Sequence, residues 1–131
     1  MLLVPVNGKE MKINSKNILA QYFTKQDIAK KLIEKTKKVL LKYEKDLQEF
    51  NWIEPSAGNG VFYNLLPKEK RIGIDIRPQL TNILEEDFLQ YKIEKNKRNI
   101  VIGNPPFGHR GVIALNFINQ LHRKQYETNR L

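Results

Sequence analysis

Hydrophobic residues recur at helical spacing in two segments of the chain. In residues 25–43, apolar side chains return at steps of three and four, and Thr24 stands where a capping residue is expected. In residues 111–124, apolar positions surround most of the helix, which favours a largely buried helix. A shorter helix is predicted at 61–66.

Four short apolar runs predict β-strands at 50–53, 71–75, 83–85 and 99–103. These strands alternate with the predicted helices. The alternation indicates a Rossmann-like α/β fold, with a mostly parallel sheet and helices on both of its faces. Because no repeat or linker interrupts the pattern, residues 1–131 are predicted to form a single domain.

The turn after the first strand, Glu54-Pro-Ser-Ala-Gly-Asn-Gly60, contains two glycines that allow a ligand to approach bare backbone. Asp75 ends the next strand, where a carboxylate can accept hydrogen bonds from ribose hydroxyls. A carboxylate there can equally cap the end of the strand before Pro78. Together with the glycine turn, Asp75 favours a nucleoside ligand.

The segment Asn104-Pro-Pro-Phe107 follows the last predicted strand. Its prolines make the loop rigid. The Asn104 side-chain oxygen and the Pro105 carbonyl can both accept hydrogen bonds from an amine, and Phe107 can stack on the ring that carries it. A Pro-Pro turn with a core phenylalanine is the alternative interpretation.

In this order, the segments Glu54–Gly60, Asp75, Asp87-Phe88 and Asn104–Phe107 resemble the motifs of N6-adenine DNA methyltransferases. Gln21-Tyr-Phe-Thr24 is similar to that family's amino-terminal cofactor motif. The resemblance covers about 21–121. It implies the amino-terminal half of an S-adenosylmethionine-dependent amino-methyltransferase domain.

The resemblance implies S-adenosyl-L-methionine as the cofactor, with no metal. The residues that it places around the methionine portion are Phe23, Thr24, Glu54, Ala57 and Gly58, and the same turn contributes Pro55 and Gly60. Those that it places around the ribose and adenine are Asp75, Ile76, Asp87 and Phe88.

The resemblance also implies a catalytic loop formed by Asn104, Pro105, Pro106 and Phe107, which grips an adenine flipped out of its duplex. Direct methyl transfer needs no strong base. We therefore expect His109 and His122 to lie outside the site.

Relatives of this family continue past the catalytic loop with further strands. The family's sheet has the strand order 3-2-1-4-5-7-6. In this chain the sheet is expected to end at strand 4, so the exposed edge of that strand would be covered by a complementing chain or by a second copy in a homo-oligomer. Eleven residues separate Asp75 from Asp87, too few for a full crossover helix. Four alternatives stay open: an RNA adenine acceptor, a protein glutamine acceptor, an inactive binding module, and one subunit of a split enzyme.

Charge favours a nucleic-acid partner, with DNA as the expected polymer. The chain has 23 Lys+Arg against 14 Asp+Glu and a net charge of +9, which suits a polyanion. The lysines of 30–38 can instead simply solvate a helix.

The chain has no cysteine, which excludes disulfides and thiolate sites. No apolar run is long enough for a membrane span, so a cytoplasmic or other intracellular soluble protein is expected.

Overall fold

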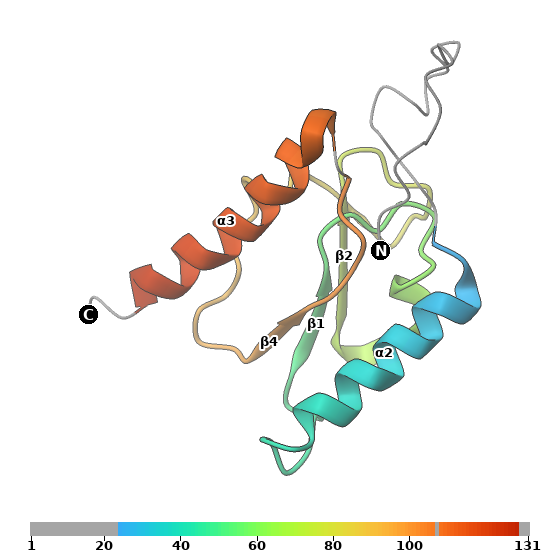
Figure 1. Cartoon of the computed structure of the whole chain (residues 1–131), viewed down its shortest axis with the longest axis vertical. Helices are drawn as coiled ribbons and strands as arrows, with labels where there is room; N and C mark the ends of the chain where they lie inside the picture. The colour runs from blue at the N-terminus through green and yellow to red at the C-terminus, as the bar shows by residue number, and fades with distance from the viewer. Residues whose placement is uncertain (1–23, 107, 129–131) are drawn as a thin grey trace. The chain divides into compact units, whose positions relative to one another are not determined.

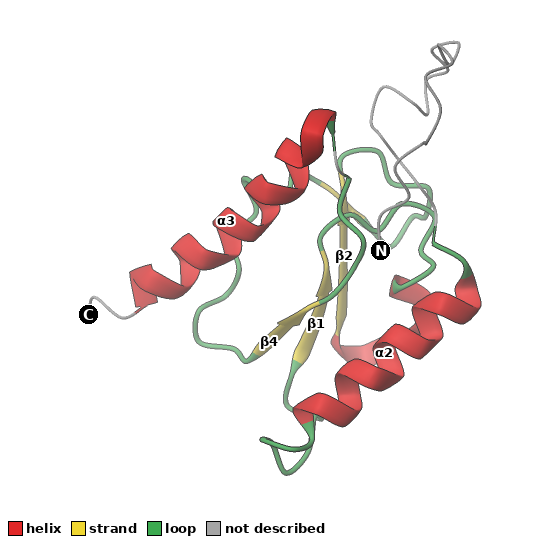
Figure 2. Cartoon of the chain, in the orientation of Figure 1, coloured by secondary structure: helices red, strands yellow, loops and turns green. Residues whose placement is uncertain are grey.

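The computed structural model describes residues 24–106 and 108–128 (Figures 1 and 2). These residues belong to two compact units. The larger unit, Phe23–Gly103, contains the sheet and the first helix. The second unit includes the chain from Asn104 onward and contains the second helix. The prediction of one domain over 1–131 stays a prediction.

Four strands form the sheet: β1 (Asn51–Glu54), β2 (Arg71–Asp75), β3 (Leu84–Glu85) and β4 (Asn99–Val101). Their order is β3-β2-β1-β4, and each neighbouring pair is parallel. The predicted Rossmann-like α/β class is confirmed. The strand order equals the 3-2-1-4 part of the order expected from the family resemblance, and β4 is one of the two outer strands of the described sheet, with β3 at the other side.

Helix α2 (Gln26–Leu40) lies along the sheet within the larger unit (Figure 1), and its apolar side joins the core. Ala29 and Ile33 are its buried residues, because their spacing of four places both on one face. They join one core cluster with aromatic and aliphatic residues of β1, β4 and the segments before and after β1: Phe50, Trp52, Phe62, Leu66 and Ile100. This core holds β1 and β4 in place beneath the helix.

The ends of two predicted helices differ in the structure. Helix α2 stops at Leu40, three residues before the predicted end, and its N-cap is Lys25, one residue after the predicted Thr24. The helix predicted at 61–66 is only a 3-10 turn, η1 (Tyr63–Leu65). Leu66 is already extended because it precedes Pro67, and the residue before a proline is disfavoured in helical conformation.

The connection from β2 to β3 contains no helix, as the short spacing from Asp75 to Asp87 indicated. Residues 76–83 form turns, and β3 contributes only Leu84 and Glu85 to the sheet. A second 3-10 turn, η2 (Lys68–Lys70), leads into β2. The third strand is therefore present but short.

The second unit contains the 3-10 turn η3 (His109–Gly111) and helix α3 (Val112–Thr128). The prediction that this helix is largely buried is wrong, because Val112, Leu115 and Ile118 are more than half exposed. These residues share one face at three-residue steps, whereas Phe117 is buried. Within the described residues, no helix combines the length and the apolar character needed to cross a membrane.

Candidate functional site

Two buried carboxylates end neighbouring strands at one edge of the sheet. Glu54 is the last residue of β1 and Asp75 the last of β2, and they are only 2% and 5% exposed. Glu54 pairs with Gly73 in the parallel register, so β2 extends beyond it to Asp75. Burying carboxylates is costly, so two of them buried side by side mark a candidate functional site. This carboxyl-end edge is the candidate site.

The glycine turn after β1 is attached to the end of β2 by two backbone hydrogen bonds. The Gly58 N–H donates to Asp75 Oδ2 at 2.7 Å. The Ala57 N–H donates to the Ile74 carbonyl at 2.9 Å. The structure thus brings together the two features that were predicted to share a ligand, the glycine turn and the strand-end carboxylate.

Both glycines of the turn have backbone conformations that favour glycine. Gly58 has φ 53° and Gly60 has φ 82°. A Cβ on Gly60 would also lie 2.5 Å from Leu80 Cδ1. Gly60 therefore packs closely against a side chain of the loop after β2, so the turn and that loop are in contact at this glycine.

Asp75 caps backbone groups with both of its carboxylate oxygens. Oδ2 accepts the Gly58 N–H, and Oδ1 accepts the Arg77 N–H at 2.8 Å. The strand-end cap that the sequence left open is therefore present. Each carboxylate oxygen has two lone pairs and keeps acceptor capacity beyond these bonds. The role of Asp75 as a ribose acceptor stays a prediction.

The Glu54 side chain is a neutral acid near pH 7. Burial raises its pKa from 4.5 to about 8, the Tyr63 N–H opposes the shift by hydrogen bonding, and the charge of Asp75 adds to it. Glu54 Oε2 is buried and has no hydrogen-bond partner among the described residues. A cation placed beside Oε2 would favour the charged form.

Gly103 lies against the Glu54 carboxyl group. A Cβ on Gly103 would be 2.6 Å from Glu54 Oε1 and 3.3 Å from Pro55 Cδ. The chain that leaves β4 therefore passes Glu54 closely, and a larger residue here would require a shift. Asn104 is the next residue in the chain, so the proline loop begins directly after this contact.

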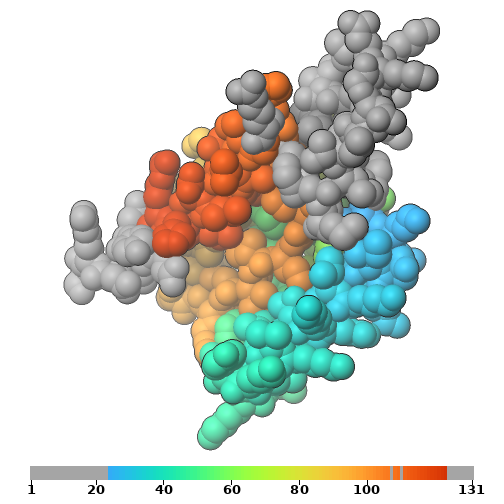
Figure 3. Space-filling view, in the orientation of Figure 1, coloured from blue at the N-terminus to red at the C-terminus, as the bar shows by residue number. Residues whose placement is uncertain are grey.

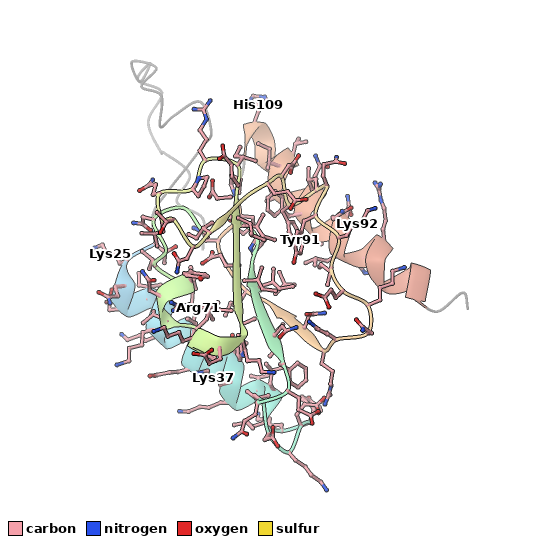
Figure 4. All side chains as sticks on the ribbon, turned by 180° about the vertical axis from the view of Figure 1, so that it is seen from behind. Lys25, Lys37, Arg71, Tyr91, Lys92 and His109 are labelled. Atoms are coloured by element: carbon pink, nitrogen blue, oxygen red, sulfur yellow. The ribbon has the colours of Figure 1, made fainter. Side chains whose placement is uncertain are left out.

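Tyr63 connects η1 to the loop after β2. Its hydroxyl accepts from Asn82 Nδ2 at 3.2 Å and donates to the Asn82 carbonyl at 3.3 Å. The Arg71 guanidinium, labelled in Figure 4 near the start of β2, lies 4.3 Å from the Tyr63 ring centroid. The sequence interpretation missed Tyr63, Asn82 and Gly103. Only Gly103 had a usable signal, its place between a strand and the proline loop.

The segment after β3 is attached to the end of β2, because the Glu86 N–H donates to the Asp75 carbonyl at 3.0 Å. Asp87 is exposed, and its Oδ1 accepts the N–H two residues ahead at 2.9 Å. Phe88 is buried. Ile76 directly follows Asp75 and is 48% exposed, so an apolar side chain faces solvent beside the candidate site.

The remaining site residues fall in other parts of the chain. Asn104, Pro105 and Pro106 are half-buried and belong to the second unit. Thr24 is half-buried and lies just before α2. Phe23 and Phe107 lie outside the described residues.

No protein-family model, curated protein or solved structure matches the chain. The fold class and the geometry of the candidate site therefore rest on the structure of this chain alone. The family remains a resemblance carried by the motifs.

Proposed function

We propose that the chain is an S-adenosylmethionine-dependent methyltransferase that acts on the exocyclic N6 amine of adenine in DNA. The observation that carries the proposal is the hydrogen bond from the Gly58 N–H to Asp75 Oδ2, which joins the glycine turn to the strand-end carboxylate. Open parallel sheets bind ligands beyond the carboxyl ends of their strands. The order β3-β2-β1-β4 also agrees with the order that the family resemblance implies.

The chemistry of this edge fits the proposed cofactor. Glu54 Oε2 is a buried acceptor without a partner in the described chain, and the ammonium group of the methionine portion would pair with it. Asp75 keeps acceptor capacity for the ribose hydroxyls. Ile76 offers an exposed apolar surface for the adenine ring, and Asp87 an exposed carboxylate for its amine.

S-adenosylmethionine would supply an electrophilic methyl group, whose bond to the sulfonium sulfur would break to release S-adenosylhomocysteine. In the proposed reaction, the Asn104 side-chain oxygen and the Pro105 carbonyl accept hydrogen bonds from the target amine, which directs the nitrogen lone pair toward that methyl group. Phe107 stacks on the flipped base, with Pro106 keeping the loop rigid. The proton that the nitrogen loses passes to water. Positioning and polarisation of the amine supply the catalysis.

Two further features support the proposed partners. The net charge of +9 favours a polyanionic acceptor such as DNA. β4 is one of the two outer strands of the described sheet, and an outer strand can pair with a complementing chain or with a second copy.

Transfer of a tritiated methyl group from S-adenosylmethionine tests the proposal. The acceptors are duplex DNA, the same length of duplex made only of G·C pairs, RNA, and protein. We expect label in the adenine-containing DNA alone, and its loss in Asn104→Ala. Label in RNA alone or in protein alone would replace the DNA substrate with the corresponding alternative. Saturable cofactor binding without transfer to any acceptor would favour a binding module or one subunit of a split enzyme.

A further inference from the structure

A cavity lies at the opposite end of the strands from the candidate site. It has a volume of about 350 Å³ and is lined by residues from the end of α2, the segment before β1, and the segment before β2. All of these residues belong to the larger unit. Figure 3 shows the surface over α2 and the turn that follows it. The volume is within the range of roughly 300–1,000 Å³ that is typical of small-molecule sites.

Three lysines from three different segments line this cavity. Lys37 is on α2, Lys45 is between α2 and β1, and Lys70 is on η2 (Figure 4 labels Lys37). Asp46 is the acidic residue of the lining, and its Oδ1 already accepts the Gln48 N–H at 2.9 Å. None of the three lysines forms an ion pair with another described residue. The cavity therefore has an excess of positive charge.

The helix dipole does not explain this arrangement. A lysine in the last turn of a helix, such as Lys37, is favourable there in any protein. Lys45 and Lys70 lie outside α2, so their convergence with Lys37 has no such cause. Lys37 is half-buried, whereas Lys45 and Lys70 are exposed, and an anion in the cavity would be attracted by all three charges.

The rest of the lining is mainly apolar. Leu41, Leu47, Trp52 and Pro67 contribute to it. Trp52 is 1% exposed, and its indole Nε1–H is a buried donor without an acceptor among the described residues. Buried donors normally have an acceptor, and an oxygen of a bound ligand would supply one.

We propose that this cavity binds a small organic anion, with its acidic group among Lys37, Lys45 and Lys70 and its apolar body against Leu41 and Leu47. The apolar lining excludes a purely inorganic anion as the preferred occupant, because such an anion leaves the lining unused. A neutral hydrocarbon is excluded as the preferred occupant because it would leave the three lysine amines without a counter-charge. This site is independent of the proposed methyltransferase function.

Trp52 is the single tryptophan of the chain, so its fluorescence reports on this cavity. The probe is 8-anilinonaphthalene-1-sulfonate, which has an aromatic body and one sulfonate. Its neutral counterpart N-phenyl-1-naphthylamine lacks the sulfonate. The test variant is Lys45→Gln/Lys70→Gln. Lys37 is left in place because its Nζ lies 5.7 Å from the Trp52 ring centroid, and replacing it would alter the reporter.

The matched control is Lys30→Gln/Lys35→Gln, which removes two exposed lysines of α2 that do not line the cavity. We expect saturable, single-site quenching of Trp52 by the anionic probe, with roughly tenfold weaker binding in the test variant and no change in the control. Equal affinity in the test variant and the wild type would overturn the proposal. So would equal affinity for the neutral probe, or displacement of the anionic probe by an equal concentration of inorganic phosphate.

Discussion

Replacing Glu54 with glutamine is expected to stabilise the unliganded protein at neutral and alkaline pH. The Glu54 carboxyl is 2% exposed, and its pKa is about 8 in the folded chain against 4.5 ordinarily. Glutamine has nearly the same shape but cannot ionise. The substitution therefore removes the cost of keeping this carboxyl protonated in the folded chain while it ionises in the unfolded chain, and it leaves the packing nearly unchanged.

The size of this effect follows from the raised pKa. Below pH 4.5 the carboxyl is protonated in both the folded and the unfolded chain, so it makes no pH-dependent contribution to the free energy of unfolding. Between pH 4.5 and 8 it ionises in the unfolded chain only, and the free energy of unfolding falls by about 1.4 kcal/mol per pH unit. The accumulated loss is roughly 3 kcal/mol near pH 7 and roughly 5 kcal/mol above pH 8, and Glu54→Gln should avoid it.

Urea denaturation at several pH values measures this difference. The wild type should become less stable than Glu54→Gln as the pH rises from about 5 to about 8. The two proteins should be nearly equal at the acidic end. Glu69→Gln is the matched control, since it removes an exposed carboxylate on η2 and should follow the wild type at every pH.

The same substitution should weaken cofactor binding, because a neutral amide pairs poorly with an ammonium group. Stability and binding would then change in opposite directions, as occurs when a functional group is retained at a cost to the fold. A constant stability difference between wild type and Glu54→Gln across this pH range would refute the reasoning, since it would mean that the buried carboxyl does not titrate as described.

Three other substitutions test the remaining parts of the site. Gly60→Ala should lower the free energy of unfolding by about 2–3 kcal/mol in urea denaturation, because its positive φ and the contact with Leu80 both disfavour a Cβ; an unchanged midpoint would contradict this. Gly103→Ala should lower the free energy of unfolding by about 1–2 kcal/mol, because the added Cβ meets the Glu54 carboxyl. The loss should be smaller in a Glu54→Asp background, where the shorter side chain leaves room, and additive losses in this double-mutant cycle would exclude the contact. Asn104→Ala should abolish methyl transfer to DNA while calorimetry finds the cofactor affinity within about threefold of wild type; equal losses of both would assign Asn104 to cofactor binding instead.

The sheet could be predicted from the sequence because each strand is a short apolar run that ends at a turn. The run at 71–75 and the run at 99–103 correspond to β2 and β4, although β4 stops at Val101. Predicting the helices was less reliable at their ends. The extended conformation of Leu66 before Pro67 limits η1 to three residues.

The candidate site could be predicted only in part. The glycine turn and Asp75 lie together, as the usual geometry of open parallel sheets indicated. The raised pKa of Glu54 depends on burial by distant segments, including the contact with Gly103, and no local pattern contains that information. The pairing of Tyr63 with Asn82 is likewise a tertiary contact between residues nineteen positions apart.

Calorimetric titration with S-adenosylmethionine tests the central claim most directly, with Asp75→Asn as the matched variant. Asparagine keeps one acceptor oxygen for the turn but loses the charge and the second acceptor. The account predicts saturable binding at a single site in the wild type and at least roughly tenfold weaker binding in Asp75→Asn, with both proteins folded by circular dichroism. Absence of binding to the folded wild type, or equal affinity in the two proteins, would contradict a cofactor site at this edge of the sheet.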